Sequence, residues 1–290
     1  MADERSFRAP IDLHTHSSVS DGTQTPCELV RSAAAAGLGT VALTDHDSTS
    51  GWHDAGEEGL SVGVSVIPGM ELSTRIDHKS IHVLGYLFDP ENSDLVSETR
   101  RIREGRLTRA RDMVEKISRD YPISWNDVLA QATQGATVGR PHIADALVAR
   151  GLVEDRSAAF AGILNWRSGY VHSHYAPHPL DGVRLIRAAG GVPVLAHPAT
   201  SPRGVVIPEN ELRALVNAGL FGLELDHREN QPEGVKTLRS FAQRYGLAIT
   251  GSSDYHGSGK PNLLGENTTA PEVVDQIISE SSGSVPFFAN

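Results

Sequence analysis

Two histidines and an aspartate near the N-terminus have the spacing of metal ligands. They are His14, His16 and Asp21 in the segment IDLHTHSSVSDG. Side chains two residues apart on a strand lie on the same face, so His14 and His16 would present both imidazoles to one site. Neutral imidazoles bind zinc, manganese or iron, and an aspartate adds a charged oxygen. Taken alone, this pattern also fits two hydrogen-bonded loop histidines.

Similar residues recur along the chain, each time beside an apolar run of strand length. The segments VALTDHDS, VIPGMELS, IHVLGY, VPVLAHPA, LELDHRE and AITGSSDYHG carry Asp45, His46, Glu71, His82, His197, Asp226, His227, Asp254 and His256. In nearly every case the polar residue stands at or just past the C-terminal end of the run. His82 is the exception, and we expect it to point inward from within its strand. A parallel α/β sheet or barrel with its site on the C-terminal face would collect these residues.

Composition limits the function classes. The 290 residues suit one α/β domain with an insertion. A net charge of -10 disfavours general affinity for nucleic acid or membrane surfaces. The polar start and the lack of a long apolar stretch predict a cytoplasmic protein with no membrane segment. The single cysteine, Cys27, excludes an intramolecular disulfide and a thiolate metal cluster, and we interpret it as a packing residue.

Strand and helix patterns alternate along most of the chain. Thr25 to Glu28 has the form of a capping box with proline at the first helical position, and the helix that follows would end at Gly37. After the first strand, the predicted strands are TVALT, VSVIPG, SIHVLGYLF, VPVLAH, LFGLEL and LAITG. The resulting count of seven is one fewer than the usual eight-stranded barrel.

The segment 94–179 interrupts this alternation. It has helical patterns and no convincing strand, so we predict a helical lid inserted into a barrel formed by residues 1–93 and 180–290. Six arginines in this segment alternate with acidic residues: Arg100, Arg101, Arg103, Arg106, Arg109 and Arg111. They fit a solvated helix face with ion pairs, and alternatively one or two of them reach an anionic substrate.

The motifs together resemble the PHP (polymerase and histidinol phosphatase) family of metal-dependent phosphoesterases, which is similar to the amidohydrolases. The matching segments are DLHTHSSVSDG, ALTDHD, PGME, HVLGY, AHP and GSSDYHG. The resemblance implies a distorted seven-stranded barrel of TIM/amidohydrolase type, in agreement with the strand count. It implies two or three metals held by nine residues: His14, His16, Asp21, His46, Glu71, His82, His197, Asp254 and His256. The insertion with GRPHIA resembles the subgroup that hydrolyses phosphates from nucleotides and short oligonucleotides, including nucleoside 3',5'-bisphosphates.

Nine nitrogen and oxygen ligands are too many for one ion and suit two or three manganese, zinc or iron ions. Glu71 is the best bridging ligand, because a carboxylate has two oxygens. The expected nucleophile is a metal-bridging hydroxide, without a covalent enzyme intermediate. Asp45 lies next to the candidate ligand His46 in the sequence. We expect it to orient a neighbouring imidazole.

Other residues are candidates for binding the substrate. Arg140, at a predicted helix N-terminus, could bind a phosphoryl group bidentately. His142 on the same turn is a weaker candidate, with a capping or core role as its alternative. His227 could bind phosphate or protonate the leaving oxygen, unless it is an ordinary loop histidine. The resemblance implies a lysine or arginine near the helix before AHP. The chain has His172, His174 and His178 there instead, and these could equally be exposed loop residues.

Several other functions compete with a nucleotide phosphoesterase. A histidinol-phosphate-type phosphatase and a non-catalytic metal-binding module would share the motifs. An amidohydrolase would usually need a lysine at a strand end, and we identify none. An exonuclease on long nucleic acid would benefit from a basic groove, which the acidic balance does not suggest. Trimming of short oligonucleotides remains open.

Overall fold

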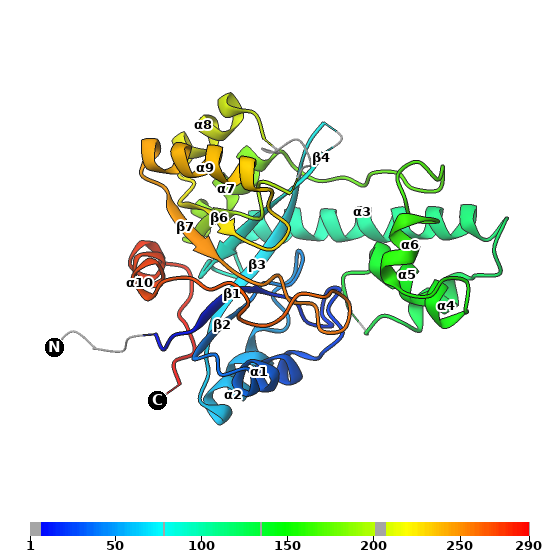
Figure 1. Ribbon diagram of the computed structural model, residues 1–290, viewed down its shortest axis with the longest axis horizontal. Coiled ribbons are helices and arrows are strands. Elements are labelled where there is room, and N and C mark those ends of the chain that lie inside the picture. The colour runs from blue at the N-terminus through cyan, green and yellow to red at the C-terminus, as the bar shows by residue number, and fades with distance from the viewer. Residues whose placement is uncertain (1–6, 78, 134, 201–206, 290) are drawn as a thin grey trace.

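The centre of the molecule is one seven-stranded sheet that curls almost into a barrel (Figure 1). The computed structural model describes residues 7–77, 79–133, 135–200 and 207–289. In sheet order, the strands are β1 Ile11–Thr15, β2 Thr40–Leu43, β3 Ser65–Ile76, β4 Lys79–Tyr86, β5 Val192–Leu195, β6 Gly222–Asp226 and β7 Ala248–Gly251. Thr15 pairs with Tyr255, just beyond β7, and so brings the two edges together. This confirms the distorted seven-stranded barrel.

Strand β4 departs from the all-parallel arrangement that the sequence suggested. The pairs β1–β2–β3 and β5–β6–β7 are parallel, but β4 runs antiparallel to both β3 and β5. The third strand is also longer than predicted, because β3 continues past Glu71 to Ile76 and pairs with β4 from Gly69 onward. Since β4 is reversed, its first half lies at the C-terminal edge of the other strands. This explains why His82 precedes its apolar residues.

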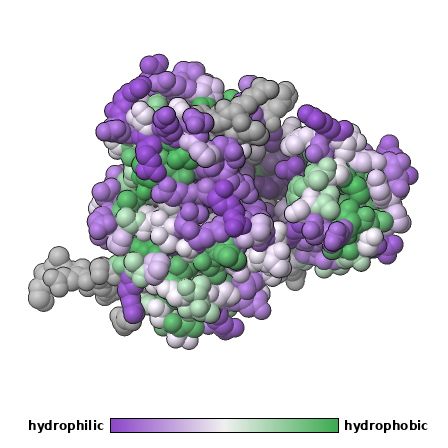
Figure 2. All heavy atoms as spheres, viewed as in Figure 1, coloured by the Kyte–Doolittle hydropathy of each residue, from purple (hydrophilic) through white to green (hydrophobic). Residues whose placement is uncertain are grey.

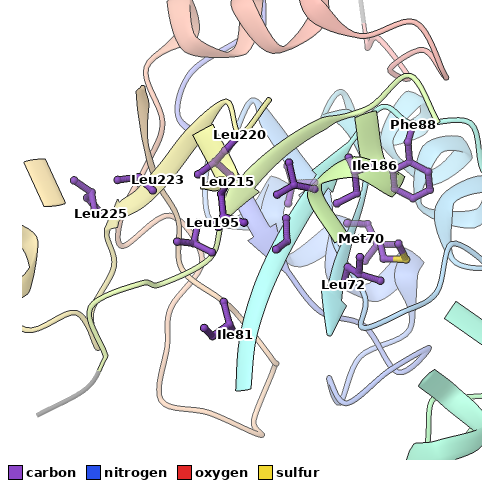
Figure 3. Close-up of a cluster of buried hydrophobic side chains, with 14 of the residues drawn as sticks. Met70, Leu72, Ile81, Phe88, Ile186, Leu195, Leu215, Leu220, Leu223 and Leu225 are labelled. Atoms are coloured by element: carbon purple, nitrogen blue, oxygen red, sulfur yellow. The ribbon is translucent and has the colours of Figure 1, made fainter. Parts of the chain in front are cut away.

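Helices cover the outside of the barrel. They are α1 Pro26–Ala35, α2 Trp52–Val62, α7 Pro179–Ala188, α8 Glu209–Asn217, α9 Pro232–Tyr245 and α10 Pro271–Glu280. The predicted capping box starts α1, where Thr25 Oγ1 accepts from the Glu28 amide and the Thr25 amide donates to the Glu28 carboxylate. Leu72 and Leu195 of the strands share a buried cluster with Ile186 of α7 and Leu215 of α8 (Figure 3). This packing fixes the strands whose ends carry the site.

Among its described residues, the segment 94–179 contains helices and no strand. The helices are α3 Ser93–Ile117, α4 Trp125–Leu129, α5 Arg140–Ala149 and α6 Arg156–Ala161. The long α3 runs outward from the barrel, and α4–α6 form a lobe on its far half (Figure 1). This lobe has its own buried cluster, which includes Met113, Ile143 and Leu147. Figure 2 shows a recess with hydrophilic side chains between the lobe and the barrel.

None of the helices in the described ranges is long and apolar enough to cross a membrane.

Candidate metal centre

All nine predicted metal ligands converge at one end of the barrel. His14 lies in β1, Glu71 in β3 and His82 in β4. The others lie in the segments that follow strands: His16 and Asp21 after β1, His46 after β2, His197 after β5, and Asp254 and His256 after β7. Parallel strands end at the same edge of a barrel, and the reversed β4 presents its early residues there. Residues more than two hundred positions apart therefore share one site.

The carboxylate of Glu71 is the centre of this cluster. It contacts five imidazoles, those of His14, His16, His46, His82 and His197. The Oε1 atom lies 2.6 Å from His82 Nδ1 and 3.0 Å from His197 Nε2. The Oε2 atom lies 3.1 to 3.3 Å from nitrogens of the other three rings. The two oxygens thus face different sets of imidazoles, as a bridging carboxylate requires.

The donor geometry fits metal ions. Among the described residues, three overlapping groups have ligand atoms within 4.8 Å of one another: His16, Asp21, His46 and His256; His14, His16, Glu71 and Asp254; and His46, Glu71 and His82. His14 Nε2 and His16 Nε2 face each other at 3.0 Å. His46 Nδ1 is buried and lies 3.2 Å from Glu71 Oε2, but it forms no hydrogen bond with the described residues. Ring nitrogens that face one another, or face a carboxylate without forming a hydrogen bond, are suited to bind a shared cation.

Charge around the cluster also favours cations. Burial disfavours the ionised form of Glu71, but the His82 and His46 imidazoles outweigh it and hold the pKa of Glu71 well below its ordinary range. Burial likewise opposes a charge on His14, but the Glu224, Glu71 and Asp254 carboxylates raise the pKa of its imidazole well above the ordinary value. The carboxylates favour protonated imidazoles when no metal is bound. A metal ion can take the place of these ring protons.

Two candidate ligands have unusual backbone conformations. His197 has φ of 28° and Asp254 has φ of 55°, both in the left-handed region. Non-glycine residues there cost about 1–3 kcal/mol and often lie at functional sites. Gly22 fulfils a related requirement beside Asp21, because a Cβ atom at this position would lie 2.2 Å from the His16 carbonyl oxygen. The tight turn that carries Asp21 back toward His16 therefore requires glycine.

Glu224 in β6 is a supporting residue that the motif analysis missed. Its Oε1 accepts a hydrogen bond from His14 Nδ1 at 2.9 Å, and its Oε2 accepts one from the His197 amide at 2.8 Å. Burial opposes its charge, but His14 outweighs this effect and lowers the pKa of Glu224 to about 2. The contact leaves His14 Nε2, on the opposite side of the ring, directed at the cluster. Carboxylates in this position orient metal-binding histidines.

Asp45 supports the cluster less directly than predicted. Its carboxylate accepts hydrogen bonds from the Ser17 amide and hydroxyl and from the Ser20 hydroxyl. Ser20 Oγ in turn lies 3.4 Å from His16 Nδ1. The hydrogen bonds of Asp45 to the described residues therefore fix the loop after β1, and they reach the His16 imidazole through Ser20.

We expect Glu224→Gln to weaken metal binding by about 10–100-fold, because the amide lacks the charge that polarises His14. Asp226→Asn is a matched control on the same strand, since Asp226 is 52% exposed and pairs with Arg239 away from the cluster. Metal affinity is measured by competition with a chelator, and thermal unfolding checks the fold. Equal affinity in Glu224→Gln and the wild type would contradict the orienting role.

A cavity of about 510 Å³ opens from the metal cluster toward the insertion. Asp21, His46, His82 and His256 form part of its wall. Six cationic residues line it, namely Arg75, Arg106, Arg109, Arg140, Arg156 and Lys260, together with Phe160, Trp166 and His174. The volume is typical of a small-molecule site. An anionic ligand that contacts both the cluster and the insertion would fit this cavity.

The cationic residues differ in how they are neutralised. Arg106 pairs with Asp47 at 3.1 Å, and Lys260 Nζ lies 2.6 Å from Asp254 Oδ2. Among the described residues, no carboxylate forms an ion pair with Arg109 or Arg140. Burial, followed by the charges of Arg106 and Arg75, lowers the pKa of Arg140 to about 10. Like charges crowded in this way attract an anion.

The predicted substrate-binding residues occupy different positions. Arg140 lies at the start of α5 and lines the cavity. His142 Nδ1 accepts from the Gly139 amide at 3.1 Å, which is the capping alternative, and His142 is absent from the cavity wall. His227 is buried beside His197, and its Nδ1 accepts from the Glu229 amide. His227 is absent from the cavity wall, but its Nε2 lies 3.7 Å from Asp254 Oδ2 of the cluster, so its roles in binding phosphate or as an acid stay predictions.

The three histidines before AHP also occupy different positions. His174 lines the cavity, with Nδ1 3.2 Å from Arg109 Nη1. His172 lies near Asp112 on the surface of α3, and His178 caps α7 by accepting from the Leu180 amide. The segment before AHP therefore supplies histidines to this region. The positive charge of the cavity comes instead from arginines of β3 and of the insertion. Arg106 and Arg109 reach the cavity, whereas Arg111 is exposed.

The barrel and its cluster of imidazoles and carboxylates define the class of metal-dependent hydrolases. The model of the PHP domain matches residues 12–132. A 3',5'-nucleoside bisphosphate phosphatase of Chromobacterium violaceum is 33% identical over 260 residues, covering 87% of this chain and 89% of the relative. A 5'-3' exoribonuclease of Haemophilus influenzae is 36% identical over 271 residues, with 92% and 96% covered.

A solved structure from Bifidobacterium adolescentis, described as a candidate metal-dependent phosphoesterase, has 42% identity and a TM-score of 0.91. The similarity covers 94% of this chain and 96% of that one. The chain therefore belongs to the PHP family and is a metal-dependent phosphoesterase.

Proposed function

We propose that this phosphoesterase hydrolyses phosphate esters of nucleotides, nucleoside 3',5'-bisphosphates in particular, with short oligonucleotides as further substrates. The observation that carries the proposal is the cavity that joins the metal cluster to the arginines of the insertion. A substrate with one phosphate at the cluster and a second anionic group near Arg109 and Arg140 would use both ends. The nucleotide-directed names of the two curated relatives support this substrate class.

The nine clustered residues are the proposed ligands for two or three divalent metals, with manganese, zinc and iron as candidates. When bound, the metals supply Lewis acidity that activates water and neutralises charge on the phosphoryl group. Glu71 would bridge them, and Glu224 would hold His14 in the correct tautomer. Lys260, beside Asp254, would add positive charge at the cluster end of the cavity.

The segment 94–179 is the proposed substrate-selecting unit. It contributes Arg106, Arg109 and Arg140 to the cavity but none of the nine clustered residues. Arg140 would bind a phosphoryl oxygen with its guanidinium, helped by the N-terminus of α5. Substitutions here should change substrate affinity without removing metal. The cytoplasmic location expected from the sequence remains part of this proposal.

A substrate series tests the proposal. With metal supplied, 3',5'-bisphosphoadenosine is expected to have a higher kcat/KM than histidinol phosphate or p-nitrophenyl phosphate, because only it carries two phosphates and a base. Phosphate release from each ester is measured, together with nucleotide release from a short single-stranded RNA. Equal efficiency for all monoesters would contradict selection by the insertion. A clear preference for the RNA would instead favour the end-trimming activity.

A further inference from the structure

An indole ring stands exposed in the wall of the cavity that the six cationic residues line. Trp166 is 52% exposed, although it is one of the larger apolar side chains in the described part of the chain. It lines the cavity together with Phe160, on the side formed by the insertion. An aromatic ring left open to solvent inside a ligand cavity offers its face to a ligand.

We propose that Trp166 is the stacking platform for the nucleobase of the substrate, with Phe160 extending the aromatic wall. This inference rests on the proposed function and names the residue that selects nucleotides over other phosphate esters. Every base has a π face, so stacking on an aromatic side chain favours a base without reading its hydrogen-bonding edge. The platform therefore recognises the presence of an aromatic base.

Arg140 connects this platform to the proposed phosphate site. Its guanidinium carbon lies 5.1 Å from the centre of the Trp166 ring and 5.5 Å from that of the Phe160 ring. In a nucleotide, the ribose separates base and phosphate. A phosphate held by Arg140 thus leaves the base within reach of the exposed indole. The same arrangement would leave a base-free sugar phosphate without an aromatic partner.

A different role for Trp166 must be separated from this one. The indole could act only on Arg140, by cation–π contact that holds the guanidinium in place. Loss of the ring would then weaken every phosphate ester equally. Loss of a platform would weaken only those that carry a base. AMP and ribose 5-phosphate differ by the base alone and therefore distinguish the two roles.

The experiment measures inhibition constants of AMP and ribose 5-phosphate against hydrolysis of p-nitrophenyl phosphate by the metal-loaded enzyme. In Trp166→Ala, we expect the constant for AMP to rise by about 5- to 150-fold and that for ribose 5-phosphate to stay unchanged. Trp166→Phe should retain most of the AMP affinity. Equal losses for both compounds, or no loss for AMP, would overturn the platform.

A binding measurement tests the platform independently of hydrolysis. The chain has 3 tryptophans, and Trp52 is buried. The methylenephosphonate analogue of AMP should quench tryptophan fluorescence in the wild type and in Trp125→Phe, but not in Trp166→Phe. Trp125 is a matched control, since it lies in α4 under Arg111 and outside the cavity. If the wild type hydrolyses no phosphate ester, the proposed function fails. Quenching that survives in Trp166→Phe overturns the platform alone.

Discussion

Replacing Glu71 by glutamine is expected to lower kcat by about three orders of magnitude while the protein remains folded. Glu71 contacts five imidazoles through two oxygens, and no other carboxylate among the described residues contacts as many imidazoles. A neutral amide has only one oxygen that can coordinate a metal, so glutamine is a poor bridging ligand. Metal-derived charge stabilisation is worth several kcal/mol in such sites, and about 1.4 kcal/mol corresponds to a tenfold change in rate.

The Glu71 variant needs two readouts and a control. Metal content per chain reports the lost ligand, and phosphate release reports the lost turnover. Glu209→Gln is a suitable control, because Glu209 is exposed on α8 and pairs with Arg244. If Glu71→Gln keeps both its metal and its rate, Glu71 is not the bridge.

Arg140→Ala should keep its metals but lose substrate binding. Removing a charged hydrogen-bond donor from a contact with a buried ion costs about 2–5 kcal/mol, so kcat/KM should fall by about one and a half to four decades. Nucleotides should lose more than a small aryl phosphate, because only nucleotides would also contact the neighbouring aromatic wall. Steady-state kinetics on 3',5'-bisphosphoadenosine and p-nitrophenyl phosphate measure the difference.

Arg111→Ala provides the matched control for this variant. Arg111 belongs to the same insertion and also lies over a tryptophan, but it is exposed on α3 and outside the cavity. Unchanged efficiency of Arg140→Ala on both substrates would place Arg140 outside the substrate site. The insertion would then have a purely structural role in this region.

The convergence of the predicted ligands could be foreseen because it depends on chain topology. Strand-length apolar runs that end in His, Asp or Glu place those residues at one edge of a barrel, whatever the loops between them do. The pair His14 and His16 follows from strand periodicity alone. Their detailed contacts could not be foreseen. The five contacts of Glu71 depend on how far β3 extends beyond β2.

The reversed strand was the part of the fold that the sequence obscured. Direction along a sheet leaves little trace in an apolar run such as SIHVLGYLF, and short connections suit antiparallel neighbours. The place of His82, ahead of its apolar residues, was a further signal of the reversal. In β4 it pairs with Ser73 and reaches the same edge as the residues that follow other strands.

Glu224 and the cavity arginines show a second limit. Glu224 stands between Leu223 and Leu225 in β6, so strand alternation predicts that its side chain points to the face opposite the two leucines. A single acidic residue in a strand is too common a feature to identify a supporting role in a metal site. Arg106 and Arg109 are three residues apart on one face of α3. Their neighbours are charged on both faces, so the buried face could not be chosen without the tertiary structure.

The most direct measurement of the central claim is metal reconstitution followed by phosphate release. Exhaustive chelation should remove hydrolysis of 3',5'-bisphosphoadenosine, and stepwise addition of manganese, zinc or iron should restore it. The cluster predicts that activity returns as two or three ions bind per chain, measured by elemental analysis of the same samples. Full activity in the metal-free protein, or recovery without bound metal, would contradict a metal centre built from these nine residues.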